Sequence, residues 1–288
     1  MLSIKHILTP VDFSERSEAA VIEATRLAEL FGANLTVMHV EPSLEAHAAY
    51  RGLAQVEQSE KTQLEASRRA EAQLRGFAAK LAPKASTVLA EGDPLTRIEE
   101  HAKNHAVDLI VIGTHGRGGF RRFLLGSLAS KLLHDMSIPM ATGAHLADHA
   151  VAPLKIAHVG CALGLDNMDD CGRILRWAGD LAQLVGAKLT VIHVPHDIDP
   201  GSFTDPETSK AQRDNAAKHI AALCEKTGVT ADVVIEGGAA MDTVAEILAA
   251  KHCDALVIGR TGQQGLFRIG HADGYALIRR SPVPVFSV

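Results

Sequence analysis

The sequence is poor in aromatic residues and in cysteine. Phe, Trp and Tyr make up 4% of the 288 residues, with a single Trp, so the core has to be mainly aliphatic. An aliphatic core suits a parallel sheet that is covered by helices on both faces. The four cysteines all lie in the second half of the chain and are too few for a disulfide scaffold, which indicates a reduced protein.

The chain also lacks a large net charge and long apolar runs. Its net charge is -5 and its pI is near 6.3, which gives no electrostatic reason to expect a nucleic-acid partner. No apolar run approaches the roughly 18 residues of a membrane span, and the first residues do not read as a secretory leader. We therefore expect a cytoplasmic protein with no nucleic-acid or membrane partner.

The second half of the chain repeats the first. Residues 27–40 read LAELFGANLTVMHV and residues 181–194 read LAQLVGAKLTVIHV, with ten of the fourteen positions identical. The pair DLIVIG, ending at Gly113, and DALVIG, ending at Gly259, repeats at a similar distance further on. Only two copies, each about half of the chain, exclude a solenoid, because solenoids stack many short repeats. The sequence predicts two domains, 1–145 and 153–288, joined by a short linker.

Strands and helices are expected to alternate within each unit. In the first half, the hydrophobic pattern predicts strands over 4–10, 35–40, 87–91, 109–113 and 140–143, with helices starting near 14, 58, 94 and 127. Such alternation predicts an α/β fold with a doubly wound, Rossmann-like parallel sheet. Ligands of these sheets bind at the carboxyl ends of the strands, here between the first and fourth strands.

A glycine-rich loop follows the fourth strand of the first half. It has the spacing G-x2-G-x9-G-S, formed by Gly113, Gly116, Gly126 and Ser127. Glycines let the backbone approach a ligand closely, and the helix that starts at Ser127 offers free N–H groups to an anion. Arg117 and its neighbours Arg121 and Arg122 add positive charge. Together these features predict a phosphate-binding loop rather than a plain connection.

The corresponding loop of the second half departs from this pattern. Its last spacing is G-x7-G, two residues shorter, and His271 takes the place of the serine. The position of Asp12 falls near Cys161, although Asp166 could reach inward. We expect this half to bind a nucleotide poorly or not at all. Arg260 and Arg268 leave a weaker anion site open.

These motifs resemble the universal stress protein family. Its nucleotide-binding members carry G-x2-G-x9-G-(S/T) after the fourth strand, and TPVDFS at residues 9–14 and HV at 39–40 match its first two strands. The resemblance covers the whole chain as a tandem pair and implies that the last strands of the two units pair across a pseudo-twofold axis. The pair would thus form an intramolecular pseudo-dimer; a homodimer of the tandem chain stays open.

The resemblance also implies a ligand and its binding residues. The ligand would be ATP, AMP or ADP in the first domain, with an accompanying Mg²⁺ left open. The residues that would hold it are Pro10, Asp12, Val40, Ile112, Gly113, Gly116, Arg117, Gly126, Ser127 and Leu128. The residues alone support Asp12 less strongly, because it could cap the next helix, a role open also to Ser14.

Two other kinds of site are weighed against this one. His158, Cys161, His193 and His196 are zinc-compatible residue types, but a strand-end histidine recurs at His39, which favours a structural role. The sequence contains neither a nucleophile elbow nor a Walker A lysine. We expect a stress-response protein that binds an adenine nucleotide and acts through an unknown protein partner. The alternatives are a weak ATPase or nucleotidyl transferase, and a nucleotide-independent lipid- or metal-binding module.

Overall fold

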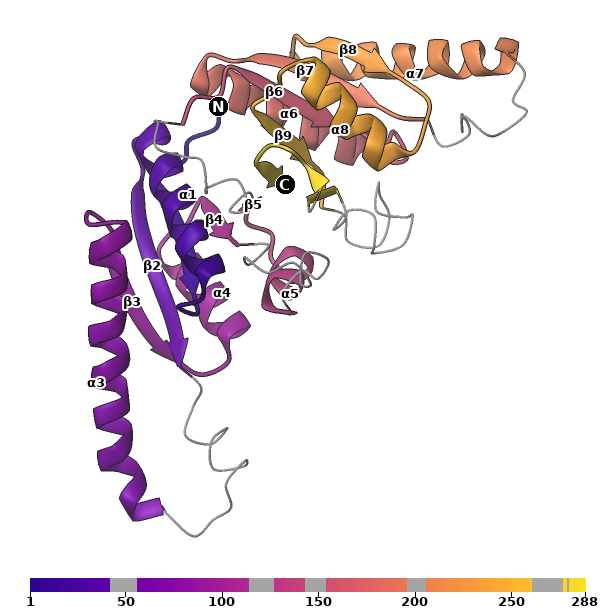
Figure 1. Ribbon diagram of the computed structural model, residues 1–288. Coiled ribbons are helices and arrows are strands. Elements are labelled where there is room, and N and C mark those ends of the chain that lie inside the picture. Colours follow the sequence, from indigo (N-terminus) through magenta and orange to yellow (C-terminus); the bar gives the residue numbers. More distant parts are fainter. Residues whose placement is uncertain (42–55, 114–126, 143–153, 196–205, 261–276, 279) are drawn as a thin grey trace.

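Ten strands form one continuous sheet in the computed structural model (Figure 1). The structure describes residues 1–41, 56–113, 127–142, 154–195, 206–260, 277–278 and 280–288. The strand order is β3-β2-β1-β4-β5-β10-β9-β6-β7-β8, with every pair parallel except β5 and β10. The predicted α/β fold is thereby confirmed.

Each half contributes five of these strands. The first half contains β1 (His6–Val11), α1 (Glu15–Phe31), β2 (Asn34–Glu41), α3 (Val56–Leu81), β3 (Ser86–Glu91), α4 (Pro94–Asn104), β4 (Leu109–Ile112), α5 (Ser127–Asp135) and β5 (Met140–Thr142). The second half contains β6 (His158–Ala162), α6 (Met168–Val185), β7 (Lys188–His193), α7 (Pro206–Thr227), β8 (Asp232–Ile235), α8 (Ala240–Ala250), β9 (Ala255–Ile258) and β10 (Val285–Ser287).

The two halves meet at the centre of the sheet. β5 pairs antiparallel with β10, and the pair Ala141–Phe286 lies in the middle of this register. Equivalent strands that run in opposite directions are what a pseudo-twofold axis produces, so the expected pairing of the last strands is confirmed. It also gives both edge strands a partner. The predicted linker over 145–153 includes residues outside the described part, so the domain boundary stays a prediction.

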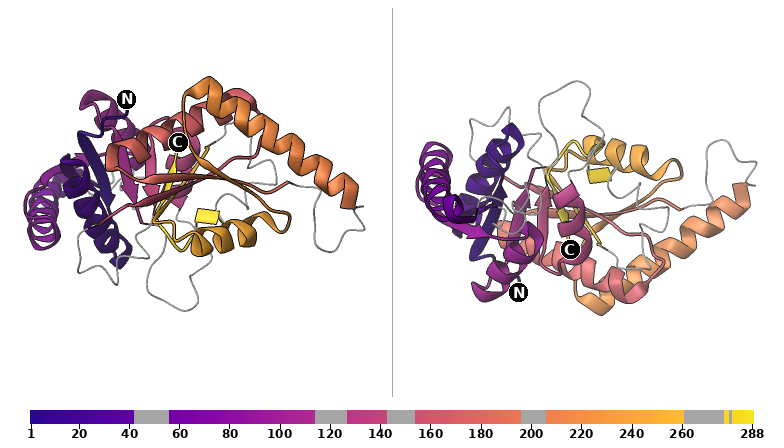
Figure 2. Two further views of the ribbon diagram at one scale, coloured as in Figure 1. Left: turned by 90° about the horizontal axis from the view of Figure 1, so that it is seen from above. Right: turned by 90° about the horizontal axis from the view of Figure 1, so that it is seen from below.

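Two aliphatic cores cover the two faces of the sheet. One core joins the strands to α1, α3, α6 and α7, and the other joins them to α4, α5 and α8. Figure 2 shows α6 and α7 on one side of the sheet and α8 on the other. Successive residues of β1 serve the two cores in turn, since Ile7 belongs to the first and Leu8 to the second. No helix of the described residues is long and apolar enough to cross a membrane.

The first helix shows how local sequence sets an element that borders the site. Ser14 is its N-cap and accepts a hydrogen bond from the Ser17 N–H at 3.4 Å. Gly32 ends the helix with φ 65° and donates its N–H to the Ala28 carbonyl. Val21 and the other apolar positions of one helix face are buried against the sheet. The start of α1 is therefore fixed directly after the end of β1.

Candidate functional site

A pocket of about 180 Å³ lies at the carboxyl ends of β1, β2 and β4. This is where the strand order places the switch point, because β1 has β2 on one side and β4 on the other. The pocket is lined by Pro10, Val11, Asp12, Ser14, Arg16, Ser17, Met38, His39, Val40, Pro94, Ile98, Ile112, Gly113, Leu128, Ala129 and Leu132.

Most of the described residues predicted from the sequence lie in this lining. They are Pro10, Asp12, Val40, Ile112, Gly113 and Leu128. Ser127 is the first residue of α5, and its side chain lies outside the described part of the chain. The predictions for Gly116, Arg117 and Gly126 also fall outside the described residues. Residues 118 positions apart in the sequence, such as Pro10 and Leu128, thus share one cavity wall.

Asp12 is the acidic group of the pocket rim, and its carboxylate is held in place by two serines. Its Oδ1 accepts hydrogen bonds from the Ser14 and Ser17 hydroxyls, each at 2.5 Å, and from the Ser14 N–H at 3.1 Å. Within the described part of the chain, Oδ2 has no hydrogen-bond donor. Burial alone would raise the pKa of Asp12, but these hydrogen bonds outweigh it and lower the pKa. Asp12 is therefore an oriented carboxylate with one oxygen available to a ligand hydroxyl.

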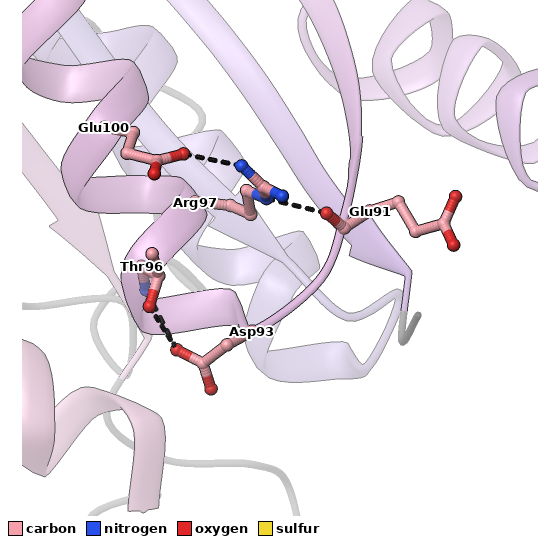
Figure 3. Close-up of polar contacts among 5 residues, drawn as sticks. All are labelled: Glu91, Asp93, Thr96, Arg97 and Glu100. Carbon is pink, nitrogen blue, oxygen red and sulfur yellow. Dashed lines mark hydrogen bonds and ion pairs between the residues drawn. The ribbon is translucent and has the colours of Figure 1, made fainter. Parts of the chain in front are cut away.

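The N-termini of three helices converge on the pocket. Ser14 begins α1, Pro94 begins α4, and Leu128 lies in the first turn of α5. The free N–H groups and the positive dipole ends of helices favour anions. The start of α4 is fixed by Asp93, whose carboxylate accepts hydrogen bonds from the N–H and the hydroxyl of Thr96, each at 3.0 Å (Figure 3). These hydrogen bonds lower the pKa of Asp93.

An arginine also braces the turn before α4. Figure 3 shows Arg97 between the end of β3 and its own helix. Its Nε donates to the Glu91 carbonyl and its Nη1 to the Glu100 carboxylate, both at 2.7 Å. Because Pro94 and Ile98 of the same helix face the pocket, this bracing holds one pocket wall against the sheet.

The inner lining of the pocket is apolar. Met38, Ile98, Ile112 and Leu132 are each at most 4% exposed. An apolar cavity with a polar rim can bury a flat ring and orient the polar part of the same ligand. Met38, Ile98 and Leu132 were not predicted, because an apolar pattern assigns a residue to the buried face of a strand or helix but not to the cavity that it lines. Arg16 and Ser17 were missed too, although they lie within five residues of Asp12.

The second half replaces the polar residues of this site. His39 Nδ1 donates to the Val11 carbonyl at 2.7 Å, and His193 Nδ1 donates in the same way to the Leu163 carbonyl at 2.8 Å. This equivalence places Gly164, three residues after Cys161, at the position of Asp12. The next residues, Phe13 and Leu165, share the left-handed conformation with φ 61° and 60°. The sequence indicated a position near Cys161, and the structure narrows it to Gly164, which has no acidic side chain.

The first turn of α6 also differs from the first turn of α1 at positions that line the pocket in the first half. Counted back from the equivalent C-cap glycines of α1 and α6, Ser17 corresponds to Cys171 and Arg16 to Asp170. Burial raises the pKa of the Cys171 thiol, so it stays protonated at neutral pH. The second half therefore has neither the carboxylate nor the hydroxyl that holds it.

Arg260 does not serve an anion site in the structure. Its Nη1 donates to the Met136 carbonyl at 2.9 Å, and its Nη2 donates to the Ile138 carbonyl. Both carbonyls belong to the first half. The expectation of a weak anion site at Arg260 is therefore wrong for this residue, while Arg268 lies outside the described part of the chain.

The zinc-compatible residues His158 and His193 do not come together in the structure. His158 begins β6 and bonds to the Lys251 carbonyl and the Thr190 hydroxyl, whereas His193 lies at the opposite end of the neighbouring strand. His196 is outside the described residues. His158 and His193 thus lie at opposite ends of neighbouring strands, and each bonds to protein groups, which agrees with the structural role favoured from the sequence. Among the described residues, no group of three or more histidine, cysteine and acidic side chains could hold a metal ion.

Comparison with known proteins identifies relatives of both halves. The sequence model of the universal stress protein family matches residues 3–142 and again 161–288. A universal stress protein of Mycolicibacterium smegmatis is 29% identical over 228 residues, which cover 76% of this chain and 75% of that protein. Universal stress protein MJ0531 of Methanocaldococcus jannaschii is 30% identical over 141 residues, which cover 47% of this chain and 79% of that protein. The crystal structure of a universal stress protein from Archaeoglobus fulgidus covers 98% of this chain and 97% of its own, with a TM-score of 0.67 at 22% identity.

Proposed function

The chain belongs to the universal stress protein family as a tandem member, and we propose that its first half binds an adenine nucleotide in the pocket at the ends of β1, β2 and β4. The observation that carries this proposal is the meeting of an apolar cavity, an oriented carboxylate and three helix N-termini in one place.

Each part of the pocket suits one part of the ligand. The apolar lining around Met38 and Ile98 would bury the purine ring. The available oxygen of Asp12 would accept a hydrogen bond from a ribose hydroxyl. The phosphates would lie against the start of α5, where the glycine-rich loop ends at Gly126 and Ser127.

We expect the role of the nucleotide to be regulatory. Bound nucleotide would change the surface beside the glycine-rich sequence 113–126, which a protein partner reads. Asp12 is the only carboxylate in the described lining of the pocket, and its Oδ1 already accepts three hydrogen bonds. Because the proposal assigns the available Oδ2 to a ribose hydroxyl, the described lining holds no second carboxylate to act as a general base for rapid hydrolysis.

Calorimetric titration of ATP into the full chain tests the proposal. We expect one site per chain, since the second half lacks the counterparts of Asp12 and Ser17. In Asp12→Asn the affinity should fall about tenfold or more, because a hydrogen bond to a charged group contributes about 1.5–3 kcal/mol. Asp166→Asn, in the corresponding loop of the second half, is the matched control and should bind as the native chain does. Absence of binding, or equal affinity in both variants, would refute the site. If native mass spectrometry showed a bound lipid or metal ion instead, the binding-module alternative would replace it.

A further inference from the structure

Among the described residues of the loop after β9, Arg260 extends a long polar side chain into the first half. It directly follows Gly259, at the point where the first half begins its phosphate-binding loop. Its own N–H donates to the Val288 carbonyl at 2.7 Å, which fixes its backbone beside β10. Its guanidinium then spans two carbonyls of the first half, those of Met136 and Ile138. Residues 122 and 124 positions apart in sequence are thereby joined.

The two carbonyls lie just beyond the C-terminus of α5. Met136 directly follows the helix and Ile138 lies two residues further on, so Arg260 is placed by the negative end of the helix dipole, where a cation is favoured. Arg260 is largely buried at this position. Burial, together with the nearby Arg173, lowers the pKa of Arg260 to about 10. The guanidinium still carries its charge at neutral pH, and the two carbonyls offset the loss of water around it.

A short chain of contacts connects this arginine with the pocket. The N–H of Met136 donates to the Leu132 carbonyl at 3.1 Å, and the carbonyl of Met136 accepts from Arg260. The side chain of Leu132 lines the pocket, as do Leu128 and Ala129 one turn earlier. The guanidinium is therefore two hydrogen bonds away from the pocket wall. The strand that follows α5 is also fixed to the second half, since β5 pairs with β10.

We propose that Arg260 is a positioning residue of the first-half pocket, supplied by the second half. It sets where α5 lies along the sheet, and hence the distance between the helix N-terminus and the β-strand ends that enclose the ligand. This inference rests on the proposed nucleotide binding. By linkage, ligand in the first half must also act back on the backbone around Arg260 and β10. The degenerate half would then contribute to binding without a ligand of its own.

Affinity measurements on matched arginine variants test the positioning role. Arg260→Met keeps the length and apolar stem of the side chain but removes both hydrogen bonds. Arg173→Met removes a neighbouring positive charge that bonds to neither carbonyl. We expect ATP to bind about fivefold more weakly or worse to Arg260→Met, in line with the usual range of coupling between sites. Arg173→Met should bind within about twofold of the native chain. Native affinity in Arg260→Met, or equal losses in both variants, would overturn the proposal.

Hydrogen exchange on the unmodified chain gives an independent readout. Saturating ATP should slow exchange at the amides of Arg260 and Val288, which lie outside the pocket and bond to the Val288 and Ile258 carbonyls. Unchanged exchange there would overturn the coupling even if Arg260→Met failed to fold. Absence of ATP binding by the native chain would instead remove the proposed function, and the coupling with it. ATP binding with unchanged affinity in Arg260→Met would remove the coupling alone.

Discussion

Gly113 and its counterpart Gly259 should respond to alanine substitution for different reasons. A Cβ on Gly113 would lie 2.6 Å from the carbonyl oxygen of Arg16, about 0.8 Å closer than the 3.4 Å of an ordinary contact. It would also lie 3.2 Å from the Cβ of Arg16. The obstacle is backbone in the first turn of α1, which cannot rotate away. A Cβ on Gly259 would instead meet the end of the Ile174 side chain.

The expected magnitude follows from this difference. Forcing an atom into a well-packed place costs about 1–3 kcal/mol, and each kcal/mol lowers the melting temperature by roughly 2–4 °C in a chain of this size. Both glycine variants should therefore melt several degrees below the native chain. The two variants should differ in whether a second substitution recovers the lost stability. Ile174→Val removes the obstructing methyl at a cost of about 0.5–1.5 kcal/mol by itself.

Double-mutant cycles followed by thermal and denaturant unfolding check this reasoning. Gly259→Ala with Ile174→Val should be less destabilised than the sum of the two single variants by about 1 kcal/mol. Gly113→Ala with Arg16→Ala should show no such relief, because the Arg16 carbonyl remains in place. Gly113→Ala should also weaken ATP binding more than Gly259→Ala, since only Gly113 lines the pocket. Relief of Gly113→Ala by Arg16→Ala would refute the assignment of the backbone carbonyl as the obstacle.

Two further predictions concern α4 and α8, the equivalent helices of the two halves. In urea unfolding, Asp93→Ala should destabilise the chain by about 1 kcal/mol, because it removes the cap of α4. Ala239 is at the cap position of α8 and makes no side-chain hydrogen bond, so Ala239→Asp should stabilise the chain by a similar amount. Opposite signs would contradict the capping role. Burial, with contributions from His105 and His6, lowers the pKa of His101, so the unfolded chain binds this proton more readily. The free energy of unfolding therefore has its full value above the pKa of the unfolded chain, about 6.5, where His101 is neutral in both states. It decreases as the pH falls below that value, because the unfolded chain then takes up the proton first. In His101→Ile, which copies Ile247 of the second half, the free energy of unfolding should fall less between pH 7.5 and 5.5, and an unchanged slope would disprove the link.

The sequence predicted those parts of the fold that rest on local pattern. Alternating apolar segments gave the parallel sheet and its switch point, because strands and helices differ in period. A helix was expected to start near residue 14, and Ser14 is the N-cap of α1. The first strand was expected to stop at Pro10, yet β1 continues to Val11. Pro10 is tolerated because the β1–β4 register ends at Leu8, so only β2 pairs with that end of the strand.

Contacts between distant segments lay beyond the sequence. The expectation for Gly113 was close approach of a ligand, whereas the structure adds a protein reason, the Arg16 carbonyl. The expectation for Arg260 was an anion, whereas its partners are carbonyls more than 120 residues away. Sequence pattern identifies a residue's chemistry and its element. Only the packing of elements decides which group the side chain meets, and a guanidinium satisfies a helix C-terminus as well as a phosphate.

The divergence of the two halves follows from the geometry that they share. Both need the glycine after the fourth strand and the histidine that bonds to the first strand's exit, because these maintain the sheet and its turns. Asp12 and Ser17 serve no such purpose, since Gly164 and Cys171 occupy their positions without loss of the fold. Under the proposed function, residues that the second half lacks while it keeps the fold are those expected to contact the ligand in the first half. By this argument the Asp12–Ser17 pair, more than the glycine-rich pattern alone, supports the first half as the half proposed to bind the nucleotide. Restoring Asp and Ser at positions 164 and 171 should accordingly not restore binding, because the second loop remains two residues short.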